Sequence, residues 1–193
     1  MPEALTIARS EFILGGQKSG KSRRAEMLAK QWIALSTSHR AVLIATAQPW
    51  DEEMHARIGR HQADRAQRVP GMQTIEEPLA LAQTLAAHSR PDVLLVVDCL
   101  TLWLTNGMMP MHPQVGAEFN IDKQVFALTE SIAIASGPVV LVGNEIGMGV
   151  IPMGAEVRAF VDALGWLNQR VAQACARVTL MAAGLPLTLK AAP

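Results

Sequence analysis

The sequence is poor in cysteine, with only Cys99 and Cys175 among its 193 residues. Two cysteines are too few for a disulfide framework, and the lack of a C-x-x-C pair argues against a structural zinc site. This composition is typical of proteins in a reducing compartment, so we expect a cytoplasmic protein. The N-terminus agrees with this expectation, because it lacks the basic segment, long apolar stretch and cleavage signal of a secretory peptide.

Net charge and long apolar runs are also lacking. The chain has 17 Lys and Arg residues and 17 Asp and Glu residues, so its formal net charge is zero. This balance argues against a general nucleic-acid binder or membrane-surface binder, which would have a basic field. The longest strongly apolar runs, such as VLLVV, are far too short to span a bilayer. Half of the residues are hydrophobic, which is enough for one sizeable core at this length.

Short apolar runs alternate with longer helical patterns along the chain. Continuous apolar strands separated by helices are typical of a mostly parallel sheet covered on both faces. We therefore predict an α/β fold in which residues 11–190 form a single domain with a short C-terminal hairpin, and residues 1–10 form a flexible N-terminal extension. The expected helices cover residues 22–35, 51–68, 78–88, 118–136 and 155–176. We expect the segment NGMMPMHPQVG, residues 106–116, to be a mobile loop.

The stretch GGQKSGKS follows the first apolar run directly. Gly15, Gly20, Lys21 and Ser22 match the pattern G-x-x-x-x-G-K-[ST] of a phosphate-binding loop. In such a loop, backbone N–H groups and the N-terminus of the next helix surround phosphate oxygens. Lys21 would reach the β- and γ-phosphates, and the Ser22 hydroxyl would hold Mg²⁺. The alternative is an ordinary glycine-rich turn, but the spacing, the lysine, the serine and the strand–helix context all favour a phosphate loop.

Asp98 ends the apolar run DVLLVVD, in the position of the second acidic motif of P-loop enzymes. Its carboxylate would lie near Mg²⁺, directly or through water. The alternative is an aspartate that only terminates the strand, and the upstream phosphate loop favours the functional interpretation. Together the two motifs predict a RecA-like P-loop NTPase fold.

The predicted helix over residues 51–68 carries acidic residues at its start and arginines in its later half, the order that the helix dipole favours. Met54, Ile58, His61 and Arg65 lie on one stripe of this helix. His61 can be a core-edge histidine beside a stacked arginine, or an imidazole nucleophile or base close to nucleotide phosphates. The pattern alone leaves both open.

Several motifs together resemble one family. The segments GGQKSGKSRRAE, IATAQPWDEEMHARIGRHQADR, VVDCLTLWLTN, GNEIGMGVIP and LGWLNQRVAQACARVTLMAAGLPLTLK are similar to the bifunctional adenosylcobinamide kinase / adenosylcobinamide-phosphate guanylyltransferases of cobalamin biosynthesis. The resemblance covers residues 11–190, and the R-I-x-x-H-x-x-x-R helix with the N-E-x-G-x-G-x-x-P loop is its most specific part. It implies phosphorylation of adenosylcobinamide, followed by transfer of GMP from GTP to the product through a GMP–histidine intermediate on His61.

The resemblance also implies a set of site residues and partners. It implies His61 and Lys21 as catalytic residues, Ser22 and Asp98 as Mg²⁺ ligands, GTP and ATP as substrates, a corrinoid partner and a homo-oligomer, expected to be a trimer. Nucleotide contacts of the family correspond to Gly15, Gly16, Gln17, Lys18, Ser19, Gly20, Lys21, Ser22, Ala45, Thr46, Ala47, Gln62, Ala63, Asp64, Arg65, Glu76 and Asp98.

This chain departs from the family pattern at two positions. The family favours serine or threonine where Gly143 stands, and arginine where Val161 stands. Glu76 could accept hydrogen bonds from the N1 and N2 donors of guanine, or be a surface acid next to Glu77. Two alternatives to a bifunctional enzyme stay open: a guanylyltransferase without the kinase step, and a GTP-binding regulator that is not catalytic. The choice of ATP or GTP as phosphoryl donor also stays open.

Overall fold

The structure, a computed structural model, describes residues 5–110 and 119–191. The strands in these residues are β1 (Ser10–Gly15), β2 (Arg40–Ala45), β3 (Gln73–Glu76), β4 (Val93–Asp98), β5 (Val139–Val142), β6 (Arg177–Ala182) and β7 (Leu185–Lys190). The helices are α1 (Lys21–Leu35), α2 (Glu52–Arg68), α3 (Leu81–His88), α4 (Leu100–Met108), α5 (Ile121–Ile134) and α6 (Ala155–Ala174).

The strands of the described residues form one sheet in the order β3-β2-β4-β5-β1-β6-β7. All neighbouring strands are parallel except β6 and β7, which form the C-terminal antiparallel hairpin. β5 lies between β1, which leads into the phosphate loop, and β4, which ends in Asp98. The α/β prediction is therefore confirmed. Because the carboxyl ends of parallel strands meet at one edge, the loops after β1, β2, β4 and β5 lie together there.

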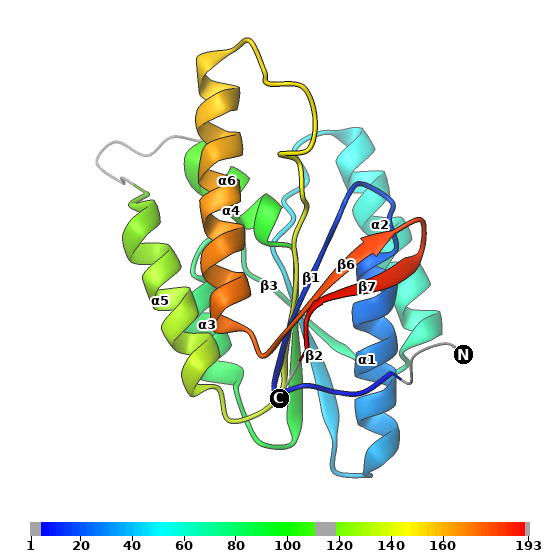
Figure 1. The fold of residues 1–193 in the computed structure, drawn as a ribbon. Helices are drawn as coiled ribbons and strands as arrows, with labels where there is room; N and C mark the ends of the chain where they lie inside the picture. Colours follow the sequence, from blue (N-terminus) through cyan, green and yellow to red (C-terminus); the bar gives the residue numbers. More distant parts are fainter. Residues whose placement is uncertain (1–4, 111–118, 192–193) are drawn as a thin grey trace.

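Helices cover both faces of the sheet (Figure 1). One hydrophobic core packs α3, α4, α5 and α6 against the face that carries Phe12 and Leu95. The second core packs α1 against the face that carries Ile13, with Leu28 fully buried from the helix. α2 has no buried residue of its own and is followed by buried Val69 in the second core.

The β6–β7 hairpin turns through two residues with positive φ, Ala183 at 52° and Gly184 at 81°. This backbone matches the twist of a two-residue hairpin, and glycine adopts it without a steric penalty. Lys190 at the end of β7 donates from Nζ to the carbonyl oxygens of Ala172, Gln173 and Cys175, at 3.1, 3.0 and 2.6 Å. The C-terminal end of α6 is thereby capped by the hairpin.

Two expectations need correction. The predicted loop over residues 106–116 is wrong at its start, because α4 runs from Leu100 to Met108. The expected helices do not include α4, whose face with Leu100, Trp103 and Leu104 is fully buried. Residues 111–118 lie outside the described part of the chain. The extension expected to be flexible packs against the domain from residue 5 onward: Ala8 is buried, and Arg177 donates to the carbonyl oxygen of Thr6 at 2.6 Å. Residues 1–4 are outside the description.

Candidate active site

The phosphate loop joins β1 to α1 at the carboxyl edge of the sheet. Gly15 has φ 152°, and a Cβ atom there would lie 2.4 Å from the carbonyl oxygen of Met181, so only glycine fits. Gly16, Gln17 and Lys18 are exposed. The loop therefore presents its backbone outward, as expected for a site that surrounds phosphate oxygens.

The C-terminal hairpin supports this loop from behind. The N–H of Gly184 in the hairpin turn donates to the carbonyl oxygen of Ser19 at 3.1 Å. The hydroxyl of Ser19 is buried and has no hydrogen-bond partner among the described residues. A buried hydroxyl without a partner is costly, so this part of the loop is not at its most stable without a further hydrogen-bonding group.

Lys21 is buried at the start of α1, with 8% of its surface exposed, and its Nζ donates to the carbonyl oxygen of Gly16 at 2.6 Å. Burial lowers the pKa of Lys21 because it removes water from the ammonium group. The charge of Arg57 on α2 acts in the same direction, and that of Asp98 acts in the opposite one. Lys21, Asp98 and Arg57 therefore share one electrostatic environment.

Thr46, just after β2, is completely buried and connects the ends of two strands. Its N–H donates to the carbonyl oxygen of Asp98 at 3.2 Å. Its hydroxyl donates to the carbonyl oxygen of Cys99 and accepts from the N–H of Cys99, at 2.7 and 2.9 Å. The carbonyl oxygen of Thr46 accepts from Asn106 Nδ2. Every polar group of Thr46 is thus hydrogen-bonded within the protein. Its role in the structure is to hold Asp98, rather than to present a hydroxyl to the nucleotide.

α2 begins after Asp51, whose side chain accepts from the N–H of Met54 at 2.7 Å. Met54, Ile58 and Arg65 are half-buried on the predicted stripe, but His61 between them is exposed. Among the described residues His61 has no hydrogen-bond partner, and no hydrogen bond or ion pair joins it to the phosphate loop. The structure does not support the alternative of a core-edge histidine.

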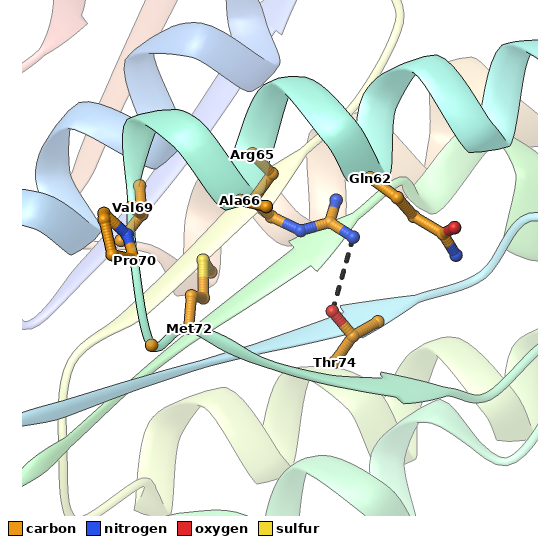
Figure 2. Close-up of a pocket in the computed structure, with 8 residues that line it drawn as sticks. Gln62, Arg65, Ala66, Val69, Pro70, Met72 and Thr74 are labelled. Carbon is orange, nitrogen blue, oxygen red and sulfur yellow. Dashed lines mark hydrogen bonds between the residues drawn. The ribbon is translucent and has the colours of Figure 1, made fainter.

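A cavity of about 360 Å³ lies between the C-terminal half of α2 and β3. Figure 2 shows Gln62 and Arg65 on its helical side and Thr74 on β3, with Arg65 Nη2 donating to Thr74 Oγ1 at 3.3 Å. Val69, Pro70 and Met72 form its apolar end. The cavity therefore combines an apolar floor with amide, guanidinium and hydroxyl groups.

The two acids at the end of β3 have different environments. Glu77 Oε1 accepts from the N–H groups of Leu79 and Ala80, at 2.8 and 2.7 Å, and so helps start α3. Glu76 is exposed and sits on the same face of β3 as Thr74, because alternate residues of a strand share a face. Glu76, unlike Glu77, is free to meet a ligand.

The predicted residues fall into two groups. Lys21, Ser22, Asp98 and Thr46 gather at the carboxyl edge of β1, β2 and β4, whereas Gln62 and Arg65 line the cavity at α2. Ala63 is exposed, and Asp64 forms an ion pair with Arg68 at 2.9 Å. Ala45 accepts from the N–H of Glu77, and Ala47 is half-buried. No role is predicted from the sequence for Arg57, which lies exposed on α2 one helical turn before His61.

The sequence profile described as "Cobinamide kinase / cobinamide phosphate guanyltransferase" matches residues 11–189. The chain belongs to this family. It is 46% identical over 183 residues to the bifunctional adenosylcobalamin biosynthesis protein CobP of Pseudomonas aeruginosa, covering 95% of this chain and 98% of that one. It is 31% and 32% identical to the CobU proteins of Escherichia coli and Salmonella typhimurium, in each case over 93% of this chain and 98% of the relative.

A solved chain described as a structural study of Project ID PH0250 from Pyrococcus horikoshii OT3 has the same fold, with a TM-score of 0.56. The match covers 98% of this chain and 90% of that one at 10% sequence identity, so the likeness concerns the fold alone. In the described residues of the cobinamide kinase family member, no helix is both long and apolar enough to cross a bilayer.

The departures from the family pattern lie beside the phosphate loop and on α6. A Cβ atom on Gly143 would lie 2.8 Å from the ring of Phe12, which is completely buried. The Phe12 ring therefore occupies the space that a serine or threonine side chain would need at position 143. Val161 is half-buried on α6, where an arginine contact is absent in this chain.

We predict that Gly143→Ser lowers the free energy of unfolding by about 1–3 kcal/mol, because an aromatic ring in a packed core cannot move aside freely. Urea denaturation followed by circular dichroism measures this change. Gly165→Ser is the control, since a Cβ atom at Gly165 has open space and helix propensity there improves. Adding Phe12→Leu to Gly143→Ser should recover part of the loss, and strictly additive effects would contradict the proposed contact.

Proposed function

We propose that the protein phosphorylates adenosylcobinamide with ATP or GTP and then transfers GMP from GTP to adenosylcobinamide phosphate. The observation that carries this proposal is the phosphate loop with buried Lys21 and an unpartnered Ser19 hydroxyl, next to Asp98. A family whose name contains both activities supports it. One phosphate loop would serve both reactions.

In the kinase step, the hydroxyl of the corrinoid side chain attacks the γ-phosphorus, the bond to the bridging oxygen breaks, and the nucleoside diphosphate leaves. Lys21 and the loop N–H groups neutralise charge on the phosphates and hold them in line with the hydroxyl. Glu145 starts the loop that faces this position, and its N–H donates to the carbonyl oxygen of Gly15 at 3.2 Å. This contact brings the segment GNEIGMGVIP beside the phosphate loop.

The residues at this edge also fit Mg²⁺. Asp98 offers a half-exposed carboxylate and Ser22 a half-buried hydroxyl, and among the described residues no cluster of three or more His, Cys, Asp or Glu side chains forms a closed metal site. An ion with few protein ligands suits Mg²⁺, which takes its other ligands from phosphates and water. When bound, Mg²⁺ supplies positive charge that offsets charge on the transferred phosphates.

For guanylyl transfer, we propose that GTP lies along α2. Arg57 precedes His61 by one helical turn, and Gln62 and Arg65 follow it and line the cavity. Residues 57–65 span about 12 Å of helix, comparable to an extended nucleotide from terminal phosphate to base. With the terminal phosphates at Lys21 and the base between Arg65 and Glu76 at the end of β3, the α-phosphorus would come next to His61.

In that arrangement a neutral imidazole nitrogen of His61 attacks the α-phosphorus and pyrophosphate leaves, forming a phosphoramidate. The phosphate of the corrinoid then attacks the same phosphorus, and the imidazole leaves. Incubation of the purified protein with α-labelled GTP tests this proposal. Acid-labile label on the chain supports it, and kinase activity without label would contradict it. Guanylyl transfer without kinase activity would favour a guanylyltransferase alone. Neither reaction would favour a GTP-binding regulator.

We predict that Glu76→Gln lowers the preference for GTP over ATP by about tenfold to a hundredfold. A carboxylate accepts from both N1 and N2 of guanine, and hydrogen bonds to charged groups are the strong ones. The ratio of kcat/KM for the two nucleotides in nucleotidyl transfer measures the effect. Glu77→Gln is the matched control, because the new amide oxygen can still accept from Leu79 and Ala80. Unchanged selectivity in Glu76→Gln would move guanine recognition elsewhere.

The corrinoid side and the assembly belong to the same proposal. Met148, Val150, Ile151 and Met153, between β5 and α6, expose most of their apolar surface. Such a surface suits the apolar rim of a corrinoid ring, and we propose that this segment contacts it.

From the family resemblance we also propose that the protein is a cytoplasmic homo-oligomer, specifically a trimer. Light scattering of the purified protein tests the oligomeric state.

A further inference from the structure

Asn106 is a buried polar residue in the last turn of α4, with 2% of its surface exposed. Its Nδ2 donates two hydrogen bonds, to the carbonyl oxygen of Thr46 at 2.7 Å and to that of Pro78 at 3.1 Å. Both partners are acceptors only, so the amide orientation is fixed: a turned amide would place oxygen against oxygen. One side chain thus joins the loop after β2 to the loop after β3.

The loop after β2 leads to the phosphate side of the site. Thr46 binds the backbone of Asp98 and Cys99 through its N–H and hydroxyl. The carbonyl oxygen of Thr46, which Asn106 binds, fixes the remaining polar group of this residue. A substitution of Asn106 therefore affects the position of Asp98 through Thr46, the one residue between them.

The loop after β3 leads to the base side of the site. Pro78 lies two residues after Glu76, and the N–H of Glu77 between them donates to the carbonyl oxygen of Ala45 at 2.9 Å. Asn106 and Ala45 thus hold the backbone that follows Glu76 at two points. The direction of an exposed carboxylate at the end of an edge strand depends on such backbone restraints.

The Asn106 Oδ1 atom is buried and has no hydrogen-bond partner among the described residues. Leaving a buried acceptor unpaired is unfavourable for stability. An apolar residue of similar size would avoid this cost but would lose both donors. The side chain is therefore placed for its two N–H groups, and an apolar residue would leave the carbonyl oxygens of Thr46 and Pro78 without these donors.

We propose that Asn106 is a positioning residue that sets nucleotide base selectivity by holding the Glu76 segment in register with the end of β2. The inference rests on the proposed function, because it takes Glu76 as the guanine contact. Asn106 itself is too buried to meet the base. It acts through Pro78 on one side and Thr46 on the other.

The test compares Asn106→Asp and Asn106→Ser with the unmodified protein. Aspartate keeps the shape but removes both donors, and serine leaves space for water if aspartate prevents folding. Fluorescence titration with ribose-labelled GTP and ribose-labelled ATP gives two dissociation constants without any corrinoid. We expect the ratio of the two constants to fall by about tenfold in the variants, since the carboxylate of Glu76 is no longer held toward the guanine donors.

Ser131→Ala is the matched control for loss of a buried polar contact. Ser131 is 8% exposed, and its hydroxyl lies 3.2 and 2.9 Å from the carbonyl oxygens of Ala82 and Ala127, away from the nucleotide loops. It should lower the melting temperature and leave the ratio unchanged. No conservative substitution of Asn106 can restore the ratio of the two dissociation constants. The decisive result is therefore that Ser131→Ala changes only the melting temperature, whereas the Asn106 variants change the ratio.

Each outcome decides the matter. An unchanged ratio in a folded Asn106 variant overturns the proposal and leaves the proposed function standing. No preference for GTP in the unmodified protein overturns both the positioning role and the assignment of Glu76 to guanine, whereas loss of both half-reactions is what would overturn the proposed function. Failure of both variants to fold assigns Asn106 to stability alone and overturns the positioning role. An equal fall of the ratio in Ser131→Ala would show that selectivity follows general stability, which also overturns it.

Discussion

Lys21→Ala should abolish both the kinase and the guanylyltransferase activity, with each rate falling at least about 10³-fold. The chain contains one G-x-x-x-x-G-K-S motif, and Lys21 is the buried cation at its end. Because the same loop would hold the phosphates in both reactions, one substitution should affect both, and Lys18 of the same loop is exposed rather than buried against it. Assays of the two half-reactions on the purified variant measure the loss.

Lys30→Ala is the control, since Lys30 is exposed further along α1 and should leave both rates unchanged. pH gives a second test on the unmodified protein. Burial lowers the pKa of Lys21, so in the free protein the ammonium loses its proton at lower pH than an exposed lysine does. Nucleotide affinity should therefore fall as the pH rises through the folded-state pKa. A folded Lys21→Ala that keeps near-normal rates in either half-reaction would contradict the single-site proposal.

The sequence predicts the sheet and the phosphate loop well because their signals are local. Each buried strand is a continuous apolar run, and the loop is defined by adjacent residues. α4 was missed although Leu100, Trp103 and Leu104 follow the i, i+3, i+4 pattern of a helix face. The helix has nine residues, and its N-terminal cap Cys99 makes no side-chain cap hydrogen bond, so the usual start signal is lacking.

The roles of Thr46 and Asn106 show why the rest of the site could not be predicted. Thr46 meets Cys99 across 53 residues, and Asn106 meets Thr46 across 60 residues. No local spacing of residues predicts such contacts, because they depend on which strands are neighbours in the sheet. The order of β2 and β4 decides them, and a single sequence does not give that order.

The sequence predicts the position of helix α2 but not the roles of its charged side chains. Its charge pattern predicts the helix, and Asp51 caps it as expected. The same pattern does not distinguish its arginines: Arg68 forms an ion pair with Glu26 of α1 at 2.7 Å, whereas Arg57 is exposed and forms no ion pair with the described residues. Charged side chains on an exposed helix look alike in sequence, and only their neighbours in space separate structural from functional ones.

His61→Asn should remove the GMP-labelled intermediate and lower guanylyl transfer at least about 10³-fold, while kinase activity persists. His61 is exposed on α2 with no hydrogen-bond partner among the described residues, so its ring nitrogens are free to attack phosphorus. Phosphorylation of the corrinoid hydroxyl needs no adduct with the enzyme, and the two activities should therefore separate. α-Labelled GTP followed by gel separation measures the adduct.

The chemistry of the bond gives a further check on the same experiment. A phosphoramidate is labile in acid and stable in base, unlike a serine or threonine phosphate ester. Label that is released by acid and retained in base therefore identifies a histidine adduct.

His55 supplies the matched control within α2. It is exposed like His61, but it lies six residues earlier and so points to a different side of the helix. Arg57, which acts on Lys21, is four residues before His61 and therefore on the same side as His61. His55→Asn should keep the labelled adduct and both activities. Label that survives in His61→Asn and disappears in His55→Asn would show that the other histidine carries GMP, and that the phosphates approach α2 from its opposite side.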